Sequence, residues 1–180
     1  MRKIVSTILV ALISFSFLGF AYSDEEEINS YLSEKVQRNT ELNFFTGMFD
    51  FSDHKQRSPV LGIEHQNDEL FIRSAGGAIY SPITGAFITG NNAFYLYTGI
   101  QAEYKIGSFI INPSFAPGYY GEGNGKDLGY PLEFKTEVQL AFDLSDNTHL
   151  GMSYNHISNA SLGDKNPGAN SYMLNFLKQF

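Results

Sequence analysis

A histidine and a serine stand two residues apart where a segment of alternating polarity meets a turn-rich loop. They are His156 and Ser158, in the run Tyr-Asn-His-Ile-Ser-Asn-Ala over residues 154–160. Alternate residues of a strand share one face, and such neighbours lie roughly 6.5 to 7 Å apart at the backbone. An imidazole can close that gap, take the serine proton and let the oxygen attack an ester carbonyl. The spacing therefore predicts a serine esterase site.

A hydrolytic site also needs a group that orients the imidazole and donors that stabilise the oxyanion. Asn170 lies on the next expected strand, with the same parity as the histidine, so its side chain is the candidate orienting group. The backbone N–H groups of Asn159 and Ala160 become free as the strand enters the loop, and we expect them to act as oxyanion donors. We expect Tyr154 and Met152, on the same face, to flank an acyl chain of the substrate.

Eight segments of alternating polarity supply the frame for these residues. Each is about 10 to 13 residues long, the length that a tilted strand needs to cross a bilayer. Clusters of Gly, Asn, Asp and Pro separate them, as expected for consecutive antiparallel strands. The segments cover residues 41–51, 58–66, 77–89, 94–106, 109–120, 132–144, 148–159 and 170–180.

The faces of these segments distinguish a membrane barrel from a soluble one. In 132–144 the even positions are apolar or Thr, while the odd positions include Glu133, Lys135 and Glu137. Mixed charges can pair inside a small closed barrel whose oily face meets lipid. The chain also ends on an aromatic residue, Phe180, as bacterial outer-membrane barrels do. We therefore predict an all-β fold, an eight-stranded antiparallel transmembrane β-barrel.

The connections between the segments orient this barrel in the membrane. The links at 105–108 and 145–147 are tight, whereas 118–130 and 159–170 are long and rich in glycine. Outer-membrane barrels have short periplasmic turns and longer extracellular loops. The His156 end of its strand is therefore expected on the extracellular side, with its side chain directed at lipid.

The first residues predict the cellular compartment. Arg2 and Lys3 precede an apolar run that ends in Ala-Tyr-Ser at 21–23, which is typical of a signal peptide cleaved after Ser23. An uncleaved membrane anchor is the alternative. We expect residues 1–23 to be this signal peptide, 24–40 a polar lead-in, and 41–180 an outer-membrane barrel.

Charge and composition exclude several classes of function. The net charge of the whole chain is −7, which argues against nucleic-acid binding, and the absence of cysteine excludes disulfides and thiolate catalysis. The glycine-rich run at 121–127 lacks the spacing of a phosphate-binding loop. His54, His65 and His149 are dispersed without metal-ligand spacing, and we expect them in loops or at the membrane interface. No metal or cofactor is expected.

The motif residues and the architecture together resemble the outer-membrane lipid A 3-O-deacylase (PagL) family. The resemblance rests on His-x-Ser-Asn-Ala at 156–160, Asn-Pro-Gly at 166–168, the signal peptide, the eight strands and the terminal phenylalanine. It implies a Ser-His-Glu triad that removes the ester-linked 3-hydroxyacyl chain at the 3 position of lipid A. By position, Ser158 is the nucleophile and His156 the general base, with Asn159 and Ala160 near the oxyanion hole.

The sequence departs from the family at the triad acid, whose position holds Asn170. An amide can hold the imidazole tautomer but cannot stabilise imidazolium by charge. Asp164 is the alternative acid if the loop folds back, whereas the parity of Glu133 directs it into the barrel.

Two rival interpretations are a non-catalytic outer-membrane structural or binding barrel, with the pair as rim residues, and a soluble lipocalin-type barrel. For the esterase, the expected partner is lipid A or lipopolysaccharide of the outer leaflet. A homodimer is left open.

Overall fold

The computed structural model describes residues 30, 40–68, 70, 72–75 and 78–180. The predicted signal peptide lies outside these residues, as does all of the lead-in except Ser30 and Thr40. The strands in this part of the chain are β1 (Thr40–Phe49), β2 (Ser58–Asn67), β3 (Arg73–Ala75), β4 (Ala78–Thr89), β5 (Phe94–Ile106), β6 (Phe109–Gly121), β7 (Leu132–Ser145), β8 (Thr148–Ser158) and β9 (Ala169–Gln179).

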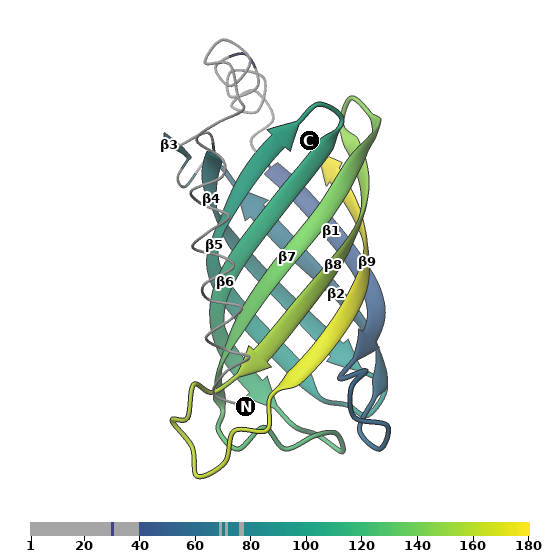
Figure 1. Ribbon diagram of the computed structural model, residues 1–180, viewed down its shortest axis with the longest axis vertical. Helices are drawn as coiled ribbons and strands as arrows, with labels where there is room; N and C mark the ends of the chain where they lie inside the picture. Colours follow the sequence, from purple (N-terminus) through teal and green to yellow (C-terminus); the bar gives the residue numbers. More distant parts are fainter. Residues whose placement is uncertain (1–29, 31–39, 69, 71, 76–77) are drawn as a thin grey trace.

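Eight long strands close into one antiparallel barrel. The order is β2-β1-β9-β8-β7-β6-β5-β4-β3, and an additional pairing of β2 with β4 closes the sheet (Figure 1). β3 has three residues and was not expected, and among the described strands it pairs with β4 alone. The predicted eight-stranded fold is confirmed, and the long strands begin and end within two residues of the predicted segments.

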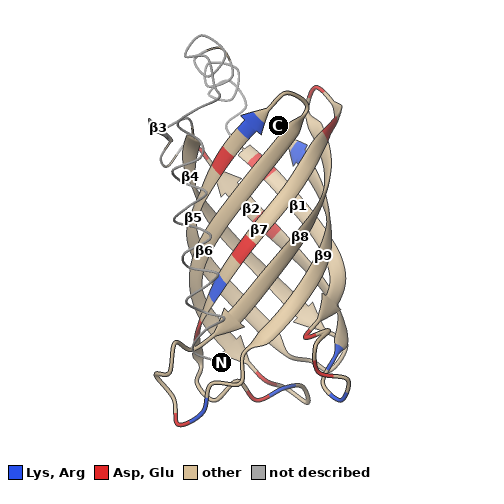
Figure 2. Ribbon diagram, in the orientation of Figure 1, with Lys and Arg blue, Asp and Glu red and all other residues tan. Residues whose placement is uncertain are grey.

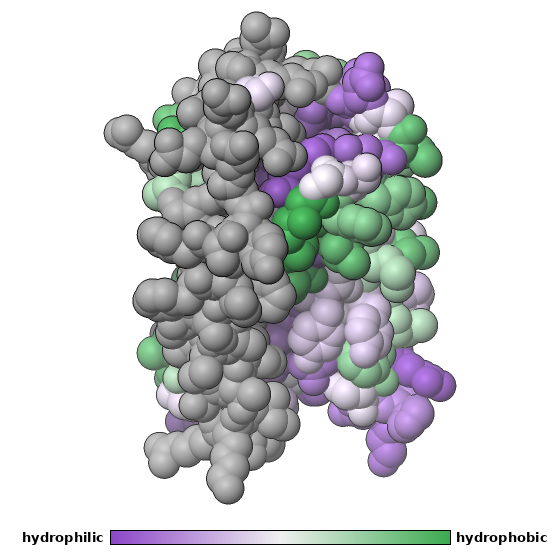
Figure 3. Space-filling model, turned by 45° about the horizontal axis from the view of Figure 1, so that its top comes forward, coloured by the Kyte–Doolittle hydropathy of each residue, from purple (hydrophilic) through white to green (hydrophobic). Residues whose placement is uncertain are grey.

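The side chains have the polarity of a barrel in lipid. Along β7, Glu133, Lys135 and Glu137 are buried inside, whereas Val138 and Leu140 are exposed outside. On the part of the surface that Figure 3 shows in colour, hydrophobic residues gather between more hydrophilic ends, and in Figure 2 the charges gather mainly toward the two ends. Strand alternation with a polar interior is the pattern of outer-membrane barrels. Within the described residues, no helix is long and apolar enough to span a membrane.

Paired charges fill the middle of the barrel. Lys135 on β7 reaches across to Glu64 on β2, with Nζ 3.0 Å from the carboxylate, and lies 3.5 Å from Glu137. The Tyr97 hydroxyl donates to Glu64 at 2.8 Å, and the lysine ammonium lies 4.1 Å from the centre of the Tyr97 ring. Buried charges are tolerated when they are paired in this way.

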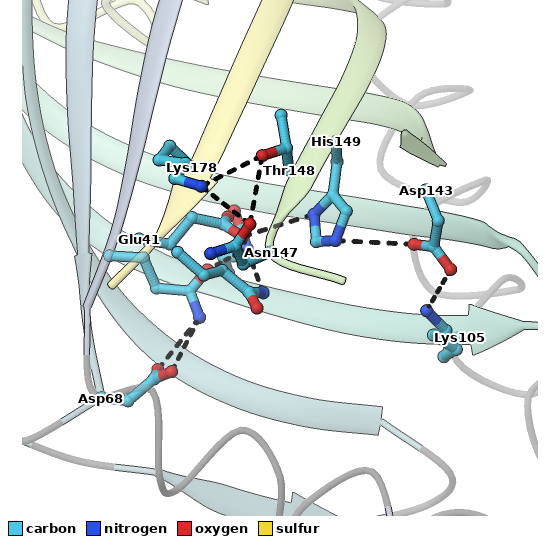
Figure 4. Close-up of polar contacts among 11 residues, drawn as sticks. Glu41, Asp68, Lys105, Asp143, Asn147, Thr148, His149 and Lys178 are labelled. Atoms are coloured by element: carbon cyan, nitrogen blue, oxygen red, sulfur yellow. Dashed lines mark hydrogen bonds and ion pairs between the residues drawn. The ribbon is translucent and has the colours of Figure 1, made fainter. Parts of the chain in front are cut away.

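A second polar cluster lies at the short-turn end of the barrel (Figure 4). His149 is 4% exposed and points inward, with Nδ1 3.6 Å from Glu41 and Nε2 3.5 Å from Asp143. Lys105 pairs with Asp143 at 2.8 Å. The expectation of His149 in a loop or at the interface is therefore wrong. His149 lies seven positions before His156 on β8, roughly 23 Å away, so it belongs to the opposite end of the barrel.

Candidate active site

The predicted site residues lie where β8 and β9 meet the long β8–β9 loop (159–168). In Figure 1 this loop shares the lower end of the barrel with the β1–β2 loop (50–57) and the β6–β7 loop (122–131). The antiparallel register places Asn170 directly opposite His156 on one side, and Thr136 on the other. Residues that lie directly opposite in such a pair can make side-chain contact. Ladder register therefore brings the predicted base and its orienting group together.

The side-chain amide oxygen of Asn170, Oδ1, accepts two hydrogen bonds. Nδ1 of His156 lies 2.8 Å from Oδ1, and the Tyr154 hydroxyl donates to the same oxygen at 2.8 Å. Since an amide oxygen only accepts, the imidazole must donate through Nδ1–H. The proton is then absent from Nε2 of the neutral ring, which leaves a lone pair there. This is the tautomer that a general base requires.

The second ring nitrogen of His156, Nε2, is the atom that would act as the general base. This atom is buried, and among the described residues it has no hydrogen-bond partner. The half-buried Ser158 follows two residues later on the same outward face, as the burial pattern of β8 requires. The predicted hydrogen bond between them is therefore not formed in this structure. Catalytic hydrogen bonds are often long before substrate binds, and the roles of both residues remain predictions.

The β8–β9 loop packs directly against the imidazole. Gly168 has φ +63°, and a Cβ placed on it would lie 2.8 Å from His156 Cε1 and 3.3 Å from Nε2. Only glycine meets both conditions, because other residues disfavour this φ and would also displace the ring. Gly168 is the glycine of the Asn-Pro-Gly run in the sequence motif. Its positive φ and its close contact with the imidazole are the two reasons why this position requires glycine.

Asn159 organises the loop with its side chain. It is fully buried, donates from Nδ2 to the Leu128 and Lys165 carbonyls at 2.8 Å each, and accepts from the Ser161 N–H at 2.9 Å. Its own N–H, predicted as an oxyanion donor, donates to Asn166 Oδ1 at 3.2 Å. This predicted donor is thus already engaged.

Ala160 is the other predicted donor. Its N–H has no hydrogen-bond partner in the part of the chain that the structure describes. Ala160 and Ser161 have φ 53° and 69°, and the Leu162 N–H closes the turn onto the Asn159 carbonyl at 3.0 Å. Positive φ at both central residues is the geometry of a type I′ turn. This turn leaves the Ala160 N–H available, while its role as oxyanion donor remains a prediction.

The alternative acids lie away from the imidazole. Asp164 is exposed in the β8–β9 loop and forms no hydrogen bond or ion pair with the described residues. Glu133 is fully buried and points into the barrel, as its parity predicts. Asn170 is thus the group on His156 Nδ1.

The sequence did not indicate that the β1–β2 loop borders this site. The Phe51 N–H donates to the backbone carbonyl of Asn170 at 2.9 Å, and the Phe51 ring stacks on Tyr172 with ring centroids 4.1 Å apart. Tyr154 joins them, 5.6 Å from Tyr172 and 6.4 Å from Phe51 between ring centroids. These aromatic rings form an apolar wall beside the imidazole. Closure of the predicted barrel could have indicated this contact, because β1 pairs with β9 and the loop after β1 must therefore lie near the start of β9.

Ion pairs tie the outer loops together. Lys126 in the β6–β7 loop pairs with Asp50 at 2.6 Å, and Asp127 pairs with Lys165 of the β8–β9 loop. The hydrogen bond from Lys165, the Gly129 N–H and the lysine charge lower the pKa of Asp127 below its ordinary range. No group of three or more metal-ligating side chains occurs within the described residues. The three loops therefore hold one another around the site by charge and hydrogen bonding.

Fold and site together define a membrane-spanning β-barrel that carries a histidine and a serine on its lipid-facing wall. The family model for lipid A 3-O-deacylase (PagL) matches residues 41–178, and the chain belongs to this family. The family resemblance stated from the sequence is thus confirmed, and family and barrel together indicate the bacterial outer membrane.

One curated protein and two solved structures are similar to this chain. The lipid A deacylase PagL of Bordetella bronchiseptica (strain ATCC BAA-588 / NCTC 13252 / RB50) is 30% identical over 87 residues. This match covers 48% of the chain and only 42% of that relative. The crystal structure of the outer membrane enzyme PagL has a TM-score of 0.59 at 18% identity, covering 78% of this chain and 99% of that one. A structure from the de novo design of transmembrane β-barrels reaches 0.51 at 9% identity, covering 78% of this chain and 95% of that one. These two structures share the barrel fold.

Proposed function

We propose that this protein is an outer-membrane serine esterase that hydrolyses the ester-linked 3-hydroxyacyl chain at the 3 position of lipid A. The observation that carries the proposal is the state of His156, whose Nδ1 is held by Asn170 while Nε2 has no hydrogen-bond partner among the described residues. A serine lies two residues away on the same lipid-facing wall. Membership of the deacylase family supports the substrate class.

The mechanism follows the roles of these side chains. His156 Nε2 takes the proton of Ser158 as Oγ attacks the ester carbonyl carbon, and the oxyanion forms beside the Ala160 N–H. Collapse of the intermediate breaks the bond to the sugar oxygen, which takes the proton from imidazolium and leaves as the 3-hydroxyl group. Water activated by His156 then hydrolyses the acyl-serine and releases the fatty acid.

The position of the site suits a lipid of the outer leaflet. Tyr154 and Met152 point outward on β8, Met152 being 62% exposed, where acyl chains of a bilayer lipid would pass. The reaction uses residues of one chain, so it does not depend on the homodimer left open by the sequence. No residue of this mechanism requires a metal or cofactor.

Mass spectrometry of lipid A tests the proposal. Cells that express the wild-type protein should contain lipid A lacking one 3-hydroxyacyl chain, and cells with Ser158→Ala should retain that chain. Ser145→Ala is the matched control, because Ser145 is exposed at the opposite end of β7 and should leave deacylation unchanged. Identical lipid A from wild type and Ser158→Ala would instead support the non-catalytic barrel.

A further inference from the structure

A buried carboxylate lies behind the orienting amide of the site. Asp50 is fully buried at the start of the β1–β2 loop and has φ 50°. Its N–H donates to Ser171 Oγ at 3.3 Å, and its Oδ1 accepts from the Asn170 N–H at 3.4 Å. The β1–β2 loop is therefore docked onto the first residues of β9, beside His156.

Side-chain hydrogen bonds connect this carboxylate to the imidazole. Ser52 Oγ lies 3.3 Å from Asp50 Oδ1, and Asn170 Nδ2 donates to Ser52 Oγ at 3.2 Å. At the other end of the same amide, Oδ1 accepts from Tyr154 and from His156 Nδ1. The path thus runs from Asp50 through Ser52 and Asn170 to His156.

Each bond in this path has a fixed direction. An ionised carboxylate only accepts hydrogen bonds, so Ser52 must donate to Asp50. The Ser52 oxygen then presents lone pairs to Asn170, which requires the NH₂ end of the amide to face Ser52. The carbonyl end consequently faces His156, and the ring must carry its proton on Nδ1.

Lys126 determines how the carboxylate can act. Its Nζ lies 2.6 Å from Asp50 Oδ2, so the buried charge is paired. A paired carboxylate adds little negative potential at the imidazole, whereas its hydrogen-bonding direction is unaffected. Asp50 therefore acts on the site through orientation.

We propose that Asp50 and Ser52 are positioning residues of the esterase site, which set the orientation of the Asn170 amide and, through it, the tautomer of His156. The inference rests on the proposed function for its catalytic meaning. The β1–β2 loop thereby helps to hold the Nδ1–H tautomer, which a triad carboxylate holds alone. A carboxylate at position 170 would accept from the ring in either orientation of its own side chain, whereas an amide accepts in only one.

The first test reads the tautomer without measuring activity. Nitrogen-15 NMR of the full-length barrel in detergent micelles distinguishes Nδ1–H from Nε2–H imidazole, and His156→Gln identifies the signal. We expect mainly the Nδ1–H form in the wild type and a several-fold larger Nε2–H population in Ser52→Ala. Equal populations in the two proteins would overturn the inference.

The second test is kinetic. Ser52→Ala should lower kcat by roughly three- to tenfold with KM unchanged, and Asp50→Asn should act in the same direction. Ser52→Ala leaves the ion pair between Asp50 and Lys126 in place, so it separates the hydrogen-bond path from docking of the loop. Lys55→Ala, an exposed side chain on the same loop, is the matched control and should retain wild-type kcat.

A double-mutant cycle tests whether Ser52 matters only while residue 170 is an amide. In an Asn170→Asp background, Ser52→Ala should have little effect on kcat, because both carboxylate oxygens accept. A full Ser52→Ala effect in that background would overturn the inference. If the wild type itself does not deacylate lipid A, the proposed function fails, while the tautomer populations still decide the role of Asp50 and Ser52.

Discussion

His156 and Asn170 face each other across the β8–β9 ladder, with the imidazole Nδ1 2.8 Å from the amide Oδ1. The amide fixes the ring and its tautomer but offers no charge to the imidazolium that forms during catalysis. Hydrogen bonds to a charged acceptor are roughly twice as strong as those between neutral groups. The site therefore has the orientation of a triad without its full electrostatic stabilisation.

Asn170→Asp should raise turnover. The substitution keeps the length of the side chain and replaces the amide oxygen by a carboxylate oxygen, which stabilises imidazolium in the transition state. We expect kcat for a lipid A ester to increase by about tenfold, as measured with purified protein in detergent. Asn170→Ala, which removes the acceptor, should lower kcat. Turnover of Asn170→Asp at or below that of the wild type would contradict the account of position 170.

Gly168→Ala should inactivate the site while the barrel remains folded. The added Cβ would lie 2.8 Å from His156 Cε1, so the ring or the loop must shift. We expect kcat to fall by at least about tenfold, because misplacement near 1 Å can cost a hundredfold. Heat-modifiable gel migration should remain that of the wild type.

Gly107→Ala is the matched control for this substitution. Gly107 also has a positive φ, +59°, but a Cβ there would meet nothing within 4 Å. Both variants carry the backbone cost, and only Gly168→Ala disturbs the imidazole. Equal activities of the two variants would show that contact with the ring is unimportant.

The sequence predicts the barrel well because strand alternation is a local property. Side-chain parity in β7 was enough to place Glu133, Lys135 and Glu137 inside and the apolar residues in lipid. The β8–β9 hairpin likewise brings His156 and Asn170 together after 14 residues. Local periodicity and one hairpin register thus account for the fold and for the centre of the site.

Contacts between distant segments could not be predicted in the same way. Asp50 and Asn170 are 120 residues apart and meet only because β1 closes the barrel against β9. His149 was misjudged for a different reason, because strand alternation was not applied to it. Its odd position on β8 has the inward parity of Ser153 and Asn155, and the tight β7–β8 hairpin places it opposite Asp143. The engagement of the Asn159 N–H depends on loop conformation, which alternation does not describe.

Lys135→Met should destabilise the barrel strongly. The Lys135 side chain is 3% exposed and pairs with Glu64 and Glu137, so its removal leaves two buried carboxylates without their cation. Breaking a buried pair typically costs about 3 to 5 kcal/mol. Urea unfolding in lipid vesicles should report a loss of this size, and Glu64→Gln should partly restore stability in the double variant.

Lys105→Met is the control for burial. Lys105 pairs with Asp143 at 2.8 Å, but the two side chains are 23% and 33% exposed. Solvated pairs contribute about 0 to 1 kcal/mol, so the free energy of unfolding should change little. Comparable losses in Lys105→Met and Lys135→Met would contradict the importance of the interior pairing.

The rate of amide hydrogen exchange in the β8–β9 loop should depend on the protonation of Asp127. Its pKa is lowered by the hydrogen bond from Lys165, by the Gly129 N–H and by the lysine charge. A depressed pKa stabilises the paired state above the ordinary aspartate pKa, and this stabilisation is lost as the pH falls through the lowered value. Amide hydrogen exchange in residues 159–168, corrected for its intrinsic pH dependence, should therefore be constant between about pH 5 and 8 and faster in stronger acid.

Asp127→Asn should reproduce the effect of acid at neutral pH. The variant removes the charge that holds Lys165, so residues 159–168 should exchange a few-fold faster than in the wild type at low salt. Because both side chains are more than half exposed, high salt should reduce this difference. Asp164 lies in the β8–β9 loop itself and has no partner among the described residues, so Asp164→Asn should leave exchange unchanged. Equal exchange in Asp127→Asn and the wild type at low salt would show that the ion pair does not hold the loops together.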